Sequence, residues 1–142
     1  GELKAPVAIE QDGKIIISGS ETKTSAIVTG KVKAKEVKIK ARYVDNTGNI
    51  EGKKVAITAH NISQQGKIIA DDVTVNFTGK YIDNEQSNIT AINISVLGAA
   101  GSGANISGNY NENSETAKGG TINFVLKDIF SWAHLFSIIL KT

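Results

Sequence analysis

The most concentrated source of chemistry in this sequence is residues 31–42 (KVKAKEVKIKAR), where basic and apolar residues alternate. A period of two places alternate side chains on one side of an extended chain, so we predict a strand face that carries six cations. The six are Lys31, Lys33, Lys35, Lys38, Lys40 and Arg42. One interpretation is a solvated face that discourages edge-to-edge pairing. The other is binding of sulfated glycans or other anionic surfaces, because the fields of closely spaced cations add.

The acidic residues and histidines give weaker indications of a functional site than the basic run does. Oxygen-rich pairs occur at positions 45–46, 71–72 and 83–84, but residues 45–50 (DNTGNI) lack the sixth-position glycine of a calcium loop, and no glutamate follows at the twelfth position. Hydrogen bonding to the local backbone is the simpler interpretation. His60 and His134 lie 74 positions apart, and serines and aspartates occur without a paired base. We therefore expect no catalytic residue, no metal site and no cofactor, and predict that the chain is not an enzyme.

The composition indicates a strand-rich protein. Of the 142 residues 40 % are apolar, which suffices for one hydrophobic core, and Cys and Met are absent. Ile, Val and Ala dominate the apolar set, and β-branched residues favour strands. The net charge is only +2, and no aromatic residue interrupts the basic run. Both features argue against nucleic acid as a partner.

A repeat of about 20 residues runs through the chain. Apolar residues recur at matched positions in five successive units, with steps of 22, 18, 18 and 21: Ile15, Val37, Val55, Val73 and Ile94. A second series follows two residues later: Ile17, Ile39, Ile57, Val75 and Val96. Between these alternating strands lie turn-forming segments such as residues 45–49 (DNTGN) and 63–67 (SQQGK).

Each unit therefore has the pattern strand, turn, strand, turn. Such a unit cannot bury its apolar side alone, whereas stacking puts Ile and Val on one another along a continuous interior. The sequence predicts an all-β, right-handed parallel β-helix (β-solenoid) of about five or six coils. An antiparallel sandwich is the competing fold, but it does not require near-constant spacing of matched positions.

Residues 43–84 resemble the haemagglutinin repeats of the filamentous-haemagglutinin and contact-dependent-inhibition exoproteins. The matching positions combine turn, strand and spacing: Asp45, Asn46, Thr47, Gly48, Ile50, Val55, Ile57, Ala59, Ile62, Gly66, Ile68, Val73 and Val75. The match is close over about 42 residues and extends, with degenerate coils, over roughly residues 14–97. Glutamine stands at position 65, where the family often has a first glycine.

The resemblance implies a segment of a large bacterial protein that an outer-membrane partner transporter exports to the cell surface by two-partner secretion. The family's roles imply cell adhesion and virulence, with a host or neighbouring-cell receptor or a sulfated glycan as ligand. The alternatives are the passive shaft of a contact-dependent toxin-delivery protein and a polysaccharide-cleaving β-helix. The chain starts at Gly1 without a recognisable leader, so we expect an internal fragment.

Three segments are expected along the chain. Residues 1–97 form the coils, and residues 98–120 form a polar excursion or a degenerate coil rich in Gly, Asn and Ser. Residues 121–142 hold a last strand and an apolar end, interpreted as a short capping helix or as a truncated tail. The apolar run of 12 residues at positions 129–140 is too short for a helix that spans a bilayer, so no membrane span is predicted.

Overall fold

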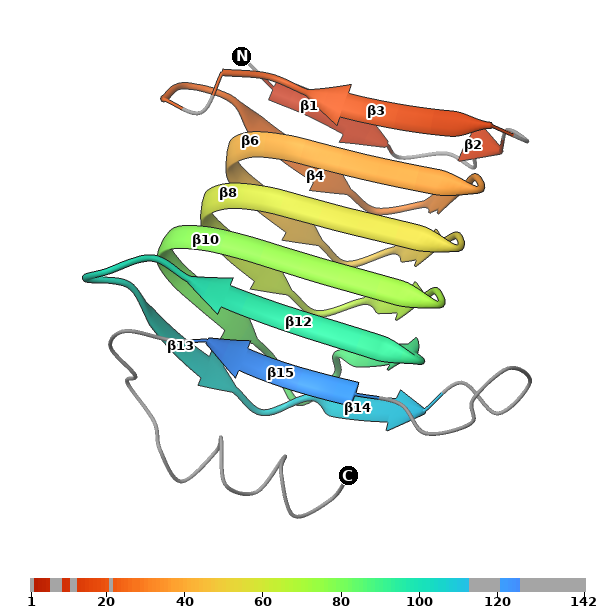
Figure 1. Cartoon of the computed structure of the whole chain (residues 1–142). Coiled ribbons are helices and arrows are strands. Elements are labelled where there is room, and N and C mark those ends of the chain that lie inside the picture. Colours follow the sequence, from red (N-terminus) through yellow and green to blue (C-terminus); the bar gives the residue numbers. More distant parts are fainter. Residues whose placement is uncertain (1, 6–8, 11–12, 21, 113–120, 126–142) are drawn as a thin grey trace.

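The chain forms a stack of parallel β-strands wound into a solenoid (Figure 1). The computed structural model describes residues 2–5, 9–10, 13–20, 22–112 and 121–125, and the side chains of residues 13–20 and 22–111. Every regular element within these ranges is a β-strand, and every strand pair is parallel. The structure thus confirms the predicted all-β solenoid, with about five coils.

Each coil has three faces. The first face contains β3 (Lys14–Ser18), the starts of β6 (Glu36–Asn46), β8 (Lys54–Gln64) and β10 (Asp72–Asp83), then β12 (Asn93–Gly98) and β15 (Thr121–Val125). The second face contains β1 (Glu2–Ala5), β4 (Ser25–Val28), the ends of β6, β8 and β10, and β13 (Gly103–Ile106). The third face contains β2 (Ile9–Glu10), β5 (Lys31–Lys33), β7 (Asn49–Glu51), β9 (Lys67–Ile69), β11 (Asn88–Ala91) and β14 (Asn109–Glu112).

The first and second faces form one nine-stranded sheet, because β6, β8 and β10 bend from one face to the other. The third face is a separate six-stranded sheet. We call the bend the first corner, the turn between the second and third faces the second corner, and the turn that leads into the next coil the third corner. Sequence reasoning expected two strands per coil. It missed the short third strand, which has three residues in β5, β7 and β9.

The strand register confirms the predicted ladder residue by residue. The first apolar series is stacked in order of the chain: Ile15 on Val37, Val55, Val73 and Ile94. The second series is stacked in the same way: Ile17 on Ile39, Ile57, Val75 and Val96. Four of the five side chains in the second series are at most 1 % exposed, while Ile17 is partly buried. Burial of these apolar side chains stabilises the stack. A single coil could not bury them without its neighbours.

Insertions at corners explain the uneven steps of the repeat. Between β3 and β4 the chain makes a wider first corner, in which the Ser20 amide donates a hydrogen bond to Thr24 Oγ1 at 2.9 Å. In the fourth coil the register shifts between Phe77 and Lys80, and the second corner lengthens to residues 84–87. Strand pairing is kept on both sides of each insertion. Extra residues at a corner therefore lengthen the repeat without changing how the strands of successive coils pair.

The narrow second corner requires glycine. An ideal Cβ built on Gly66 would lie 2.2 Å from the carbonyl oxygen of Gly48 in the coil before it. The same contact occurs one coil earlier, where a Cβ on Gly48 would lie 2.1 Å from the Gly30 oxygen. Both contacts are to backbone, which cannot rotate away. The glycines that the sequence places in these turns therefore allow successive coils to approach to hydrogen-bonding distance.

Beyond residue 97 the strands continue. β13 pairs with β10, and β14 pairs with β11, both in parallel. The segment for which the sequence suggested an excursion or a degenerate coil thus contains two strands as far as Glu112. The predicted cap or tail after residue 125 lies outside the described residues.

Candidate functional site

The basic run of residues 31–42 wraps around the solenoid. Its members are divided among two faces and two corners: Lys31 and Lys33 on the third face, Lys35 at the third corner, Lys38 and Lys40 on the first face, and Arg42 at the first corner. The expectation of one common face is therefore wrong. The chain turns at residues 34–35 from the six-stranded into the nine-stranded sheet, which separates side chains that alternate evenly in the sequence. We call this set the basic belt.

Acidic neighbours partly neutralise the basic belt. Lys31 Nζ lies 3.9 Å from Glu51 Oε2, and Lys38 Nζ lies 3.8 Å from Glu36 Oε1. Half of the Lys38 side chain is exposed, and exposed pairs of this kind contribute little to stability. The belt therefore retains solvated cations, but its field is weaker than a count of its positive charges implies.

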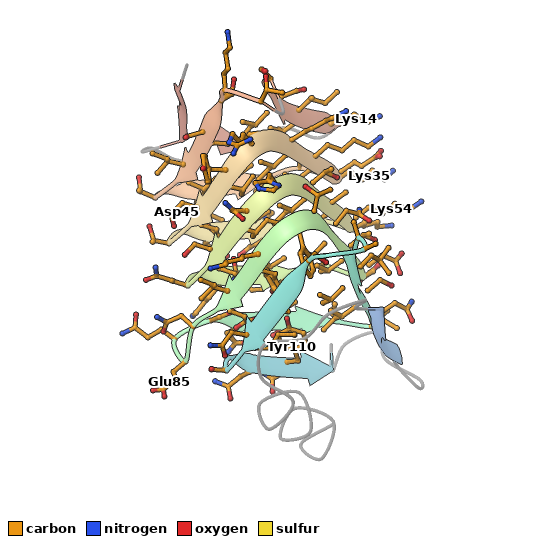
Figure 2. All side chains as sticks on the ribbon, turned by 90° about the vertical axis from the view of Figure 1, so that its left-hand side faces the viewer. Lys14, Lys35, Asp45, Lys54, Glu85 and Tyr110 are labelled. Carbon is orange, nitrogen blue, oxygen red and sulfur yellow. The ribbon has the colours of Figure 1, made fainter. Side chains whose placement is uncertain are left out.

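A second arrangement of lysines gathers at the third corner, where three successive coils each contribute. Its four lysines precede or begin the strands of the first face: Lys14, Lys35, Lys53 and Lys54. Together with Gly13 and Glu36 they line a shallow cleft of about 400 Å³. Figure 2 shows Lys14, Lys35 and Lys54 one below another along this edge of the stack. We call these four lysines the basic corner.

The charge of the basic corner changes sign along the solenoid axis. Within the cleft, Glu36 is the acidic residue, and its Oε2 lies 3.8 Å from Lys14 Nζ. In the next coil the corner carries Asp71 and Asp72 in place of lysines, and Asp72 accepts a hydrogen bond from Asn93 Nδ2 at 2.9 Å. An excess of positive charge over three coils thus ends abruptly at the fourth.

Sequence reasoning found only Lys35 of the basic corner. The others stand 21 positions before it and 18 and 19 positions after it, so they are scattered in the sequence and adjacent only in the stack. A usable signal was present. The coil steps of 22 and 18 residues align Lys35 with Lys53 and place Lys14, Glu36 and Lys54 at the next position along the strand. A search for charged residues at both of these turn positions would have grouped the four lysines.

Besides these surface lysines, the interior of the solenoid contains a column of buried polar side chains. Asn46, Gln64 and Asp83 are stacked at one inward position of the second face, and each is at most 1 % exposed. Asn46 Nδ2 donates to Gln64 Oε1 at 2.9 Å, and Gln64 Nε2 donates to the Gly66 carbonyl at 2.9 Å. These bonds satisfy the two buried amides and hold the second corner next to the core.

Asp83 continues this column as a buried acid. The Tyr81 hydroxyl lies 3.0 Å from Asp83 Oδ2 and 2.9 Å from the Tyr110 hydroxyl. Burial raises the pKa of Asp83 to about 6, and surrounding hydrogen-bond donors, led by Tyr110, limit the rise. Burial and the charge of Asp83 also raise the pKa of Tyr81 well above its ordinary value. The cluster is closed to solvent, so its role is structural and no dissolved substrate reaches it.

The first corner forms another cleft, of about 410 Å³, lined partly by Arg42 and His60. His60 Nδ1 is 2.9 Å from Thr78 Oγ1, and the Arg42 guanidinium carbon lies 5.3 Å from the Tyr43 ring centroid. Both side chains thus contact neighbouring residues on the surface of the solenoid. The second histidine, His134, lies outside the described residues.

Within the described ranges, no three His, Cys, Asp or Glu side chains are grouped so as to hold a metal ion. The same part of the chain contains no helix long and apolar enough to cross a membrane. In comparisons with known proteins, the chain matches no family model, no curated protein and no solved structure. Its fold defines it as a parallel β-solenoid, and its clearest surface feature is basic. The relation to haemagglutinin repeats stays a prediction that rests on residues 43–84.

Proposed function

We propose that this chain is a structural and binding segment of a large secreted bacterial adhesin, in which its coils form part of an elongated filament at the cell surface. The observation that carries the proposal is the continuous parallel stack, whose first three coils carry a basic outer surface. An interior ladder of Ile and Val holds successive coils together. Many of its outward positions are exposed, and in the early coils they are rich in lysine.

The proposed ligand is a sulfated glycan or another anionic cell-surface glycan. The basic belt and the basic corner together concentrate lysine on the first three coils, where several cations lie within a Debye length of one another. Such a surface binds polyanions through summed charge and not through a shaped pocket. The shallow clefts fit this mode, and the proposal assigns the chain no catalytic role.

The proposal is tested by binding to an immobilised sulfated glycan at low and high salt. We expect binding that weakens as salt screens the lysines. A belt variant with Lys33, Lys38 and Lys40 changed to Gln is expected to bind about threefold more weakly. A control variant, which removes the same charge elsewhere, changes Lys23, Lys67 and Lys80 to Gln.

The main alternative is a passive shaft of a toxin-delivery protein. Absence of binding by the wild-type chain at low salt would support that alternative and remove the adhesin segment as a glycan binder. A second assay follows the length of an acidic polysaccharide during incubation with the chain. Unchanged length agrees with the proposal, and shortening would favour a polysaccharide-cleaving enzyme.

A further inference from the structure

We propose that the basic corner is a binding site for a short, linear, regularly charged acidic polysaccharide that lies parallel to the solenoid axis. The site consists of Lys14, Lys35, Lys53 and Lys54 at the third corner. This inference rests on the proposed binding function and adds the residues, the orientation and the length of the ligand. Three of the four lysines lie outside the run that the sequence singled out.

The spacing of the lysines argues for a linear ligand. Neighbouring strands in a sheet lie about 4.8 Å apart, so equivalent corners of successive coils repeat at that distance. The corner stays in this register because the Lys53 amide donates to the Lys35 carbonyl at 2.9 Å. A sugar residue in an extended polysaccharide advances its chain by a comparable distance. One acidic group per sugar can therefore face one coil.

The charge reversal at the fourth coil sets the length of the site. Lysines occupy the corner in three coils, a span of roughly 10 Å, and Asp71 and Asp72 follow. A ligand of about three to four sugars covers this span without reaching Asp71 and Asp72; within the span, Glu36 is paired with Lys14 at 3.8 Å. A flat anionic membrane would contact the whole edge, including Asp71 and Asp72, and would be repelled there.

The absence of ring contacts argues against nucleic acid. Among residues with described side chains, Tyr43 lies on the second face, and Phe77, Tyr81 and Tyr110 are buried. Within the described part of the chain, the third corner thus has no aromatic side chain on which a base could stack. Binding of single strands usually combines cations with such platforms. Acidic groups on a saccharide need only the cations.

The test measures affinity for size-defined sulfated di-, tetra- and hexasaccharides at low salt by isothermal titration calorimetry. Affinity is expected to rise from disaccharide to tetrasaccharide and then to level off. A corner variant with Lys35, Lys53 and Lys54 changed to Gln is expected to bind the tetrasaccharide about tenfold more weakly. The control variant at Lys23, Lys67 and Lys80 loses the same charge and is expected to change affinity less than about threefold. Circular dichroism and thermal unfolding confirm that each variant folds.

A gain-of-function variant tests the axial orientation. Asp71→Lys continues the series of Lys35 and Lys53 into the fourth coil and is expected to make the tetrasaccharide bind more tightly than it binds to the wild-type chain, with a smaller effect on the disaccharide. Unchanged affinity in the corner variant, together with a loss in the belt variant, would overturn this inference and leave the proposed function standing. No binding by the wild-type chain would overturn both. Tighter binding to single-stranded DNA of equal charge, or to vesicles with acidic phospholipid, would overturn the choice of a polysaccharide.

Discussion

Replacement of Asp83 by Asn provides a sharp test of how the interior of the solenoid is held together. Asp83 is 1 % exposed, and its pKa rises from 3.8 to about 6 because burial disfavours the charged form. A shift of roughly two units corresponds to about 3 kcal/mol. Between these pH values the folded chain binds the proton more firmly than the unfolded chain does. The stabilisation from this group is therefore complete below pH 3.8 and is lost as the pH rises through about 6.

Asn cannot ionise, so the variant lacks this loss. Its amide keeps an oxygen that can accept the hydrogen bond from Tyr81, and its NH₂ group can donate to the Ser87 hydroxyl, which interacts with the Asp83 carboxyl in the wild type. We expect the variant to match the wild type near pH 4. At pH 7 we expect it to exceed the wild type by about 1–3 kcal/mol in free energy of unfolding, an upper range set by the pKa shift.

Urea unfolding followed by circular dichroism at pH 4, 5, 6 and 7 measures this difference directly. The difference between variant and wild type cancels the titration of the other carboxylates, since they are the same in both chains. A difference that does not change with pH would refute the reasoning. So would a pKa below 4.5 for Asp83, measured by NMR of its carboxyl carbon.

Two further predictions concern the stack itself. Gly66→Ala puts a Cβ about 2.2 Å from a backbone oxygen of the preceding coil and is expected to lower the free energy of unfolding by about 3 kcal/mol. The control Gly13→Ala, whose Cβ would have no neighbour within 4 Å, is expected to change that free energy by less than about 0.5 kcal/mol. Equal effects of the two variants in urea unfolding would contradict the packing argument. Ile57→Ala truncates a ladder side chain that is 1 % exposed and is expected to lower the free energy of unfolding by about 2–5 kcal/mol. The control Ile16→Ala, at a position 60 % exposed, is expected to lower it by less than about 1 kcal/mol. A loss under about 1 kcal/mol at Ile57 would show that the ladder is not the core.

The ladder of the first face was predictable because it depends on local pattern and on coil length. Alternation placed Val37, Ile39, Val55 and Ile57 inward, and the steps of the repeat aligned them in the register that the structure has. The glycine turns and the absence of long helical patterns agreed with this stack. The third strand was missed because three residues are too short to show a period, and its single inward position, such as Ile50, resembles a turn residue in sequence.

The amino-acid sequence by itself determined that the chain stacks in parallel coils, and which apolar residues form its interior. Only the tertiary structure decided which charges act together. It separated the alternating cations of residues 31–42 around two faces and two corners, and it brought Lys14, Lys35, Lys53 and Lys54 together at one corner. It also buried Asp83 behind Tyr81 and Tyr110. The reason is physical: alternation acts over a few residues, whereas a corner re-aims the chain, and neighbours on successive coils are set by strand register.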